Sequence, residues 1–142
     1  MNETIILMQL GISTVLGGLI GIMREREKKS AGLRTHILVC LGSTLLMVLS
    51  ISMAQQFPGS DAGRIAAQVI TGIGFIGAGT IIQAGQSVRG LTTAASIWVT
   101  CAIGLAVGAN LYFAASVTTL IALIVIEVVR EVEKRYLRGE DQ

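Results

Sequence analysis

The segment that most constrains the fold runs from Asp61 to Trp98 and is both apolar and dense in glycine. Its glycines crowd into one short stretch, at Gly72, Gly74, Gly77 and Gly79. In a water-soluble helix each glycine costs about 1 kcal/mol relative to alanine. A helix in a bilayer tolerates glycine, because lipid enforces backbone hydrogen bonding and glycine lets neighbouring helices approach closely. The segment therefore predicts a membrane-embedded helix that packs tightly.

Apolar stretches recur along the chain. Hydrophobic residues make up 52% of the 142 residues and charged residues only 14%. A helix needs about 20 apolar residues to cross a bilayer. Five stretches qualify, at about 5–23, 36–54, 65–83, 91–109 and 111–129, with a turn at Asn110 and a short charged cytoplasmic tail at 130–142. We predict an all-α integral membrane protein, a single compact bundle of five transmembrane helices with short loops.

The distribution of lysine and arginine predicts the orientation. Basic residues cluster after the first span, after the third span and in the tail, at Arg24, Arg26, Lys28, Lys29, Arg34, Arg89, Arg130, Lys134, Arg135 and Arg138. The other side carries only Arg64, with Asp61 beside it. Because basic loops stay in the cytoplasm, we expect the N-terminus outside and the C-terminus inside. The small net charge of +2 argues against nucleic-acid binding.

Small residues form ridges that favour close helix contacts. They recur every four residues in the first span (Ser13, Gly17, Gly21) and in the fourth (Ser96, Thr100, Gly104, Gly108). These two ridges are candidate contacts between copies, so we expect a homodimer or a higher homo-oligomer. In the third span, Gly72 and Gly79 share one face, and Gly74 and Gly77 point roughly the other way. That division predicts that the third span lies between two neighbours as the central helix.

A polar stripe enters the membrane on the third span. Arg64, Gln68 and Thr71 are spaced i, i+4 and i+7, so they share a helix face. Ionisable residues at membrane depth usually face a bundle interior or a cavity. Asp61 has two open roles: it caps the helix, or it pairs with Arg64 and binds a cation or a partner group.

Charged residues also gather where the predicted helices meet the cytoplasm. They are Arg24, Glu25, Arg34, His36, Arg89 and Glu127. One interpretation is a half-buried ion cluster, and the other is ordinary orientation-setting charge with snorkelling side chains. An acid contributes nothing to the positive-inside signal, so Glu25 favours the cluster.

The single histidine, His36, is more typical of a hydrogen-bonded packing residue than of a ligand. A metal site made of His36, Cys40 and Cys101 is disfavoured, because Cys101 should lie deeper in the membrane than Cys40. The sequence therefore assigns no metal ligand set and no cofactor.

Four ordered segments, GGLIGIMRERE, AGLRTHILVCLGS, DAGRIAAQVITGIGFIGAGTI and VRGLTTAASIWVTCAIGLAVG, make the chain resemble the MgtC/SapB family of bacterial inner-membrane proteins. The resemblance runs over nearly the whole chain. The matching positions are Gly21, Arg24, Glu25, Gly32, Leu33, Arg34, Thr35, Asp61, Arg64, Gly72, Gly74, Gly77, Gly79, Gly90, Thr92, Thr93 and Trp98. Longer members carry a soluble cytoplasmic domain after the fifth span, so we expect a short form without that domain.

The resemblance implies a regulator linked to growth under magnesium limitation, acting on other membrane machinery such as the proton-translocating ATP synthase. The expected partners are the lipid bilayer, further copies of the chain and another membrane protein. A small cation (magnesium) or metabolite transporter or channel is the alternative. An intramembrane enzyme is disfavoured, because the sequence shows neither an HExxH motif nor a nucleophile–base pair.

Overall fold

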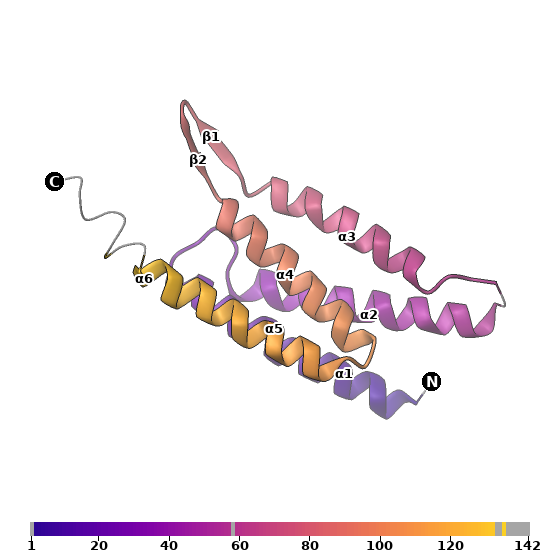
Figure 1. The fold of residues 1–142 in the computed structure, drawn as a ribbon. Helices are drawn as coiled ribbons and strands as arrows, with labels where there is room; N and C mark the ends of the chain where they lie inside the picture. The colour runs from indigo at the N-terminus through magenta and orange to yellow at the C-terminus, as the bar shows by residue number, and fades with distance from the viewer. Residues whose placement is uncertain (1, 58, 133–134, 136–142) are drawn as a thin grey trace.

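The computed structural model describes residues 2–57, 59–132 and 135, and it is an all-helical bundle with one small hairpin (Figure 1). The elements are α1 (Glu3–Arg26), α2 (Leu33–Gln56), α3 (Gly63–Ala78), β1 (Ile82–Ala84), β2 (Ser87–Arg89), α4 (Leu91–Gly108), α5 (Tyr112–Ile124), the π-helical turn η1 (Val125–Val129) and α6 (Arg130–Val132). The predicted all-α membrane class is confirmed. Most of the predicted tail at 130–142 lies outside the described residues.

Four helices are long and apolar enough to cross a bilayer: α1, α2, α4 and the continuous helix Tyr112–Val132. The fifth, α3, has 16 residues, which is about 24 Å of helix. A hydrocarbon core of about 30 Å is longer than that. The prediction of five transmembrane helices is therefore only partly supported.

The third predicted span ends too late, because 79–83 is not part of α3. The helix stops at Ala78, and the Thr80 hydroxyl donates to the Gly77 carbonyl at 2.8 Å. The chain then forms an antiparallel hairpin in which Ile82 pairs with Arg89. Gly85 turns this hairpin in the left-handed region at φ +61°, which glycine adopts without steric cost. The sequence stays apolar through Ile81 and Ile82, so hydropathy alone did not show where the helix ends.

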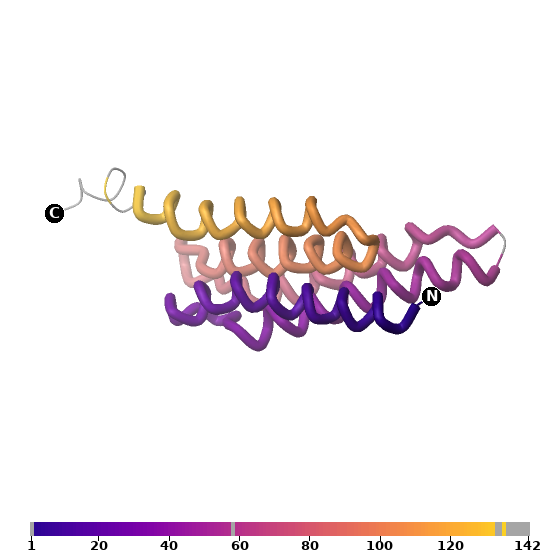
Figure 2. The backbone as a smooth tube through the Cα atoms, turned by 90° about the horizontal axis from the view of Figure 1, so that it is seen from below, coloured from indigo at the N-terminus to yellow at the C-terminus, as the bar shows by residue number. Residues whose placement is uncertain are grey.

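The central helix is α4, and the prediction that the third span is central is wrong. Helix α4 packs against α1, α2, α3 and α5, whereas α3 lies at the edge of the bundle against α2 and α4 (Figures 1 and 2). The reason is the distribution of small residues. The ridge of α4 is buried along its length, from Thr93 and Ser96 to Gly104 and Gly108. In α3 only Ile73 and Gly77 are buried.

The glycine ridges of α1 and α4 make contacts within one chain, against α2. A Cβ placed on Gly17 would lie 2.7 Å from the His36 carbonyl oxygen, and one on Gly21 would lie 2.7 Å from the Leu33 Cα. At Gly108 it would lie 2.6 Å from the Thr44 carbonyl oxygen. A Cβ on Gly104 would meet the Cys40 carbonyl oxygen. These ridges are therefore occupied, and they do not serve as contacts between copies.

The glycines of α3 differ from that pattern and correct the packing prediction. Gly72 and Gly74 have open space where a Cβ would stand, and Gly79 meets only carbonyls of its own last turn. Gly77 alone makes an ordinary contact with a neighbour, at 3.6 Å from Ala94. Trp98 is half-exposed and lines a shallow pocket between α3 and α4.

Candidate functional site

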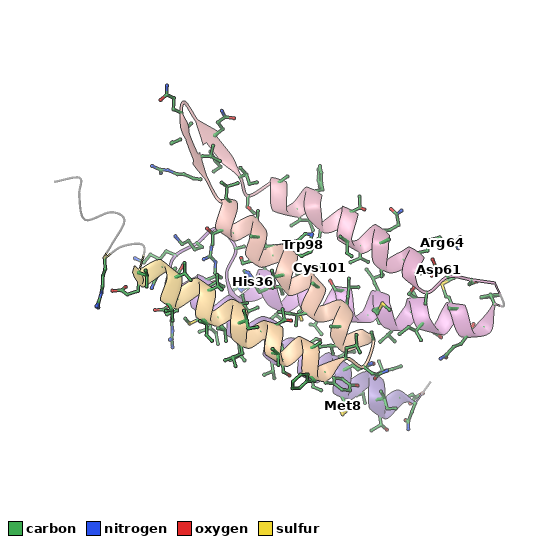
Figure 3. All side chains as sticks on the ribbon, viewed as in Figure 1. Met8, His36, Asp61, Arg64, Trp98 and Cys101 are labelled. Carbon is green, nitrogen blue, oxygen red and sulfur yellow. The ribbon has the colours of Figure 1, made fainter. Side chains whose placement is uncertain are left out.

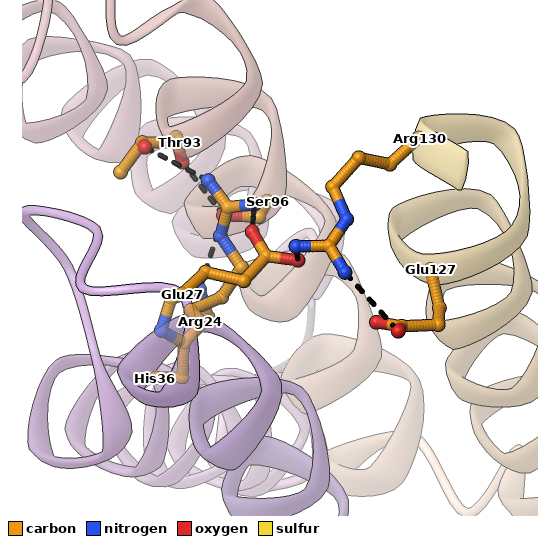
Figure 4. Close-up of polar contacts among 7 residues, drawn as sticks. All are labelled: Arg24, Glu27, His36, Thr93, Ser96, Glu127 and Arg130. Carbon is orange, nitrogen blue, oxygen red and sulfur yellow. Dashed lines mark hydrogen bonds and ion pairs between the residues drawn. The ribbon is translucent and has the colours of Figure 1, made fainter. Parts of the chain in front are cut away.

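Charged and hydroxyl side chains converge where α1 ends, α4 begins and the last helix reaches η1 and α6, at the end of the bundle opposite the N-terminus (Figure 4). The Arg24 side chain is only 2% exposed. Its guanidinium pairs with Glu27 at 3.1 Å and donates to the Thr93 hydroxyl at 2.9 Å. A buried charge without a partner is strongly destabilising, so the Glu27 carboxylate stabilises the buried Arg24 guanidinium.

A second arginine extends this cluster to the last helix. Arg130 lies 2.9 Å from Glu27 and 3.1 Å from Glu127. Glu127 belongs to η1, and Arg130 is the first residue after η1. A π-helical turn inserts an extra residue, which rotates the subsequent residues by about 100° around the helix axis. Two carboxylates and two guanidiniums thus alternate from α1 to the end of the chain's last described helix. We call Arg24, Glu27, Glu127 and Arg130 the rim cluster.

His36 lies beside the rim cluster and joins α2 to α4 (Figures 3 and 4). The ring is fully buried. Its Nδ1 is 2.8 Å from the Gly32 carbonyl and its Nε2 is 3.1 Å from the Ser96 hydroxyl. A carbonyl only accepts, so Nδ1 carries the proton. The Ser96 hydroxyl also donates to the Thr93 carbonyl at 2.8 Å, so His36, Ser96 and Thr93 form one hydrogen-bonded chain. His36 therefore has the hydrogen-bonded packing geometry that the sequence favoured.

The buried polar groups deeper in the bundle bind protein atoms. The Ser43 hydroxyl donates to the Cys101 sulfur at 3.1 Å, and the Thr44 hydroxyl donates to the Gly104 carbonyl at 2.9 Å. Cys40 and Cys101 are free and buried. Within the described residues no three His, Cys, Asp or Glu side chains come together as a metal site.

The opposite end of the bundle carries a polar anchor that the sequence interpretation missed. Gln9, on α1, is 3% exposed. Its amide nitrogen lies 3.2 Å and 3.1 Å from the carbonyls of Val107 and Gly108 and 3.0 Å from the Asn110 side chain. Asn110 makes the predicted tight turn with φ at 63°. A buried amide thus holds the α4–α5 turn to α1.

Of the charged candidates named from the sequence, the structure brings Arg24, His36 and Glu127 together at the rim, and Thr93, a position of the family resemblance, is bonded to Arg24. Thr92 lies next to them and lines an apolar pocket of about 260 Å³ between α1, α4 and α5. Glu25 is not in the cluster. Its carboxylate accepts the backbone N–H of Leu33 at 3.0 Å and so caps α2.

The remaining candidates lie away from the rim cluster. Arg34 and Arg89 are exposed. Asp61, Arg64 and Gln68 are exposed, and Asp61 and Arg64 lie at the far end of α3 (Figure 3). The Asp61 carboxylate accepts from the Gly63 N–H at 2.7 Å, as a cap does.

Two members of the rim cluster, Glu27 and Arg130, were missed by the sequence interpretation. Helical spacing carried the signal for Glu27, because residues three apart are neighbours on a helix. Arg130 was assigned to the orientation-setting charges.

Fold and site together define a multi-pass helical membrane protein with an ion cluster at one end. The sequence model of the MgtC family matches residues 10–135. The chain belongs to this family.

Three curated relatives illustrate the likeness. The putative magnesium transporter YhiD of Escherichia coli is 41% identical over 92% of this chain and 63% of its own length. The protein SapB of Bacillus subtilis is 41% identical over 96% of this chain and 63% of its own. The protein MgtC of Salmonella typhimurium is 39% identical over 91% and 54%. The chain thus spans between 54% and 63% of these relatives. No solved structure matches it.

Proposed function

We propose that this protein is a non-enzymatic regulator in the bacterial inner membrane, which acts by contact with other membrane machinery. Membership of the MgtC family supports a role linked to growth under magnesium limitation. The proton-translocating ATP synthase is the kind of machinery that the family resemblance implies. The name of the Escherichia coli relative also connects this group with magnesium.

The observation that carries the proposal is the closed centre of the bundle. Helices α1 and α4 approach the α2 backbone so closely that a single Cβ at Gly17 or Gly108 would lie within 2.7 Å of a carbonyl oxygen. The buried hydroxyls of Ser43 and Thr44 are already bonded to protein atoms. The described polar groups of this centre are hydrogen-bonded to protein atoms. A transport pathway instead needs polar groups that ions or solutes can reach.

The acidic side chains support the same conclusion. A hard divalent cation takes several oxygen ligands. Glu27 is 5% exposed and faces both Arg24 and Arg130, so its charge is already neutralised. Asp61 is committed to its helix cap through one carboxylate oxygen. The carboxylates of the described residues therefore supply no multi-oxygen site inside the bundle.

The rim cluster is the element through which a contact would be transmitted. It links α1, α4 and the end of the last helix (η1 and α6). Of its four charged groups, only Arg130 and Glu127 are partly exposed. A partner charge placed there would compete for Arg130 and so alter the bond between the last helix and α1. We place this end in the cytoplasm and the N-terminus outside, because the basic residues of the first loop, the hairpin and α6 all lie at it (Figure 1).

The alternative is a small cation or metabolite transporter, assembled from several copies. It is favoured by the name of YhiD, a putative magnesium transporter. In such an assembly the pathway would lie between copies, since the centre of one copy is closed.

Complementation combined with crosslinking tests the regulator directly. The chain, carrying a photo-crosslinking residue at exposed Lys29 beside the rim cluster, is expressed in a strain that lacks its own copy. We expect it to restore growth under magnesium limitation and to crosslink to another membrane protein. The same label at exposed Leu7, at the other end of α1, is the matched control and should give no such product. Restored growth without any crosslinked membrane protein at Lys29 would contradict the proposal.

A further inference from the structure

The outward side of α3 carries a line of exposed polar side chains that ends in an aromatic ring. Arg64, Gln68, Thr71 and Phe75 share one face of this edge helix, with Asp61 just before it, and all five residues are exposed. Phe75 is 86% exposed. The opposite side of α3, around Ile73 and Gly77, is the side that packs against the bundle. We call Asp61, Arg64, Gln68, Thr71 and Phe75 the outer α3 face.

The polar end of this face does not suit lipid, whereas Phe75 is apolar and the Thr71 hydroxyl is bonded to the Ala67 carbonyl at 3.1 Å. A side of a membrane helix that faces hydrocarbon is apolar, because an unsatisfied polar group there costs several kcal/mol. Arg64 lies in the first turn and can reach the membrane surface. Gln68 lies one turn deeper, about 6 Å along the axis, and its amide is exposed. A partner that supplies hydrogen-bonding groups at that depth would satisfy it.

The charges at the outer end specify what the partner carries. The ion pairs of the described residues are Arg24–Glu27, Arg130–Glu27, Arg130–Glu127 and Arg135–Glu131, so Asp61 and Arg64 are not joined to each other. The Asp61 cap uses Oδ1. A matching surface therefore presents a cation opposite Asp61, an anion opposite Arg64 and an amide opposite Gln68.

We propose that the outer α3 face binds the same face of a second copy of this chain. Two-fold symmetry about an axis along the membrane normal makes such an interface self-complementary. Asp61 and Arg64 are about 4.5 Å apart along the helix axis, so each Asp61 meets the partner copy's arginine diagonally, twice per dimer. Two glutamine amides then face each other across the interface.

The internal contacts of the bundle direct the pairing to this helix. The glycine ridges of α1 and α4 are filled by α2, so they are not free to join copies. The pairing does not depend on what the protein regulates.

Crosslinking locates the interface. In a background with the buried Cys40 and Cys101 replaced by alanine, Phe75→Cys is compared with Phe113→Cys on α5, which is equally exposed at 83% against 86%. Both variants are oxidised in native membranes. We expect a disulfide-linked dimer from Phe75→Cys and little from Phe113→Cys. Equal yields from the two positions, or none from Phe75→Cys, would overturn the proposal.

Charge exchange separates a contact between copies from a contact within one. Asp61→Arg makes both positions basic and Arg64→Asp makes both acidic, so each variant alone should bind itself about tenfold more weakly, on the scale of one interhelical polar contact. Mixed in lipid nanodiscs with different tags, the two variants should copurify as well as the wild type does. Thermal unfolding in detergent checks that both are folded. Two folded variants that fail to copurify, or a wild-type chain that is monomeric in nanodiscs, would refute the pairing.

Discussion

Replacing Gly104 by alanine should separate α4 from α2, and the cost follows from the structure. The new methyl group would meet the Cys40 carbonyl oxygen and lie 2.8 Å from the Ser43 Cβ. Overpacking of this kind costs about 1–3 kcal/mol. The neighbouring bond from Thr44 to the Gly104 carbonyl, 2.9 Å long, would weaken, at up to about 1 kcal/mol. Alanine returns up to about 1 kcal/mol of helix propensity. The net expectation is a loss of about 1–3 kcal/mol.

Gly72→Ala is the matched control, because its added methyl group would meet open space in an equally apolar helix. It should be neutral or stabilising, by up to about 1 kcal/mol. Reversible unfolding by sodium dodecyl sulfate in mixed micelles measures both free energies. The two variants should differ by about 1–4 kcal/mol, which is about fivefold to nearly a thousandfold in the unfolding equilibrium. Equal stabilities would show that α2 and α4 do not approach as described.

Two further predictions concern the charges and the orientation. Glu27→Gln removes the carboxylate that faces buried Arg24 and should cost about 3 kcal/mol of stability. Glu25→Gln keeps an amide oxygen for the cap of α2 and should be nearly neutral. Thermal unfolding in detergent compares the two variants, and a larger loss of stability for Glu25→Gln would contradict the assigned roles. In a background without native cysteines, Ser60→Cys should react with an impermeant thiol reagent on intact cells, and Lys28→Cys only after permeabilisation. The reverse labelling pattern would invert the topology.

The sequence was sufficient for the elements whose signal is apolar length. Helices α1, α2 and α4 begin and end within a few residues of the predicted spans, because hydrocarbon thickness fixes how long such a helix is. Helix α3 ends early because a turn needs only a few residues, and the apolar Ile81 and Ile82 lie in the turn and hairpin that follow it. Glycine density indicated that a helix permits close approach, but not which neighbour uses it.

The rim cluster was only partly predictable for a related reason. Membrane-edge position identified Arg24, His36 and Glu127 as candidates. The choice of Glu25 over Glu27 overlooked helix geometry, since a residue three positions along faces Arg24 and the adjacent one points about 100° away. The ion pair between Arg130 and Glu27 depends on the π-helical turn at Val125–Val129. The apolar sequence of that turn does not indicate that the helix contains an extra residue there.

Magnesium flux through the purified chain tests the central claim, that this closed bundle regulates by contact and does not transport. The protein is reconstituted into liposomes that enclose a magnesium indicator, with empty liposomes and an ionophore as the two reference rates. The same preparation is checked for an intact fold, and the same gene is checked for growth under magnesium limitation. We predict restored growth together with a flux equal to that of empty liposomes. A saturable magnesium uptake above that rate would contradict the regulator and establish the transporter.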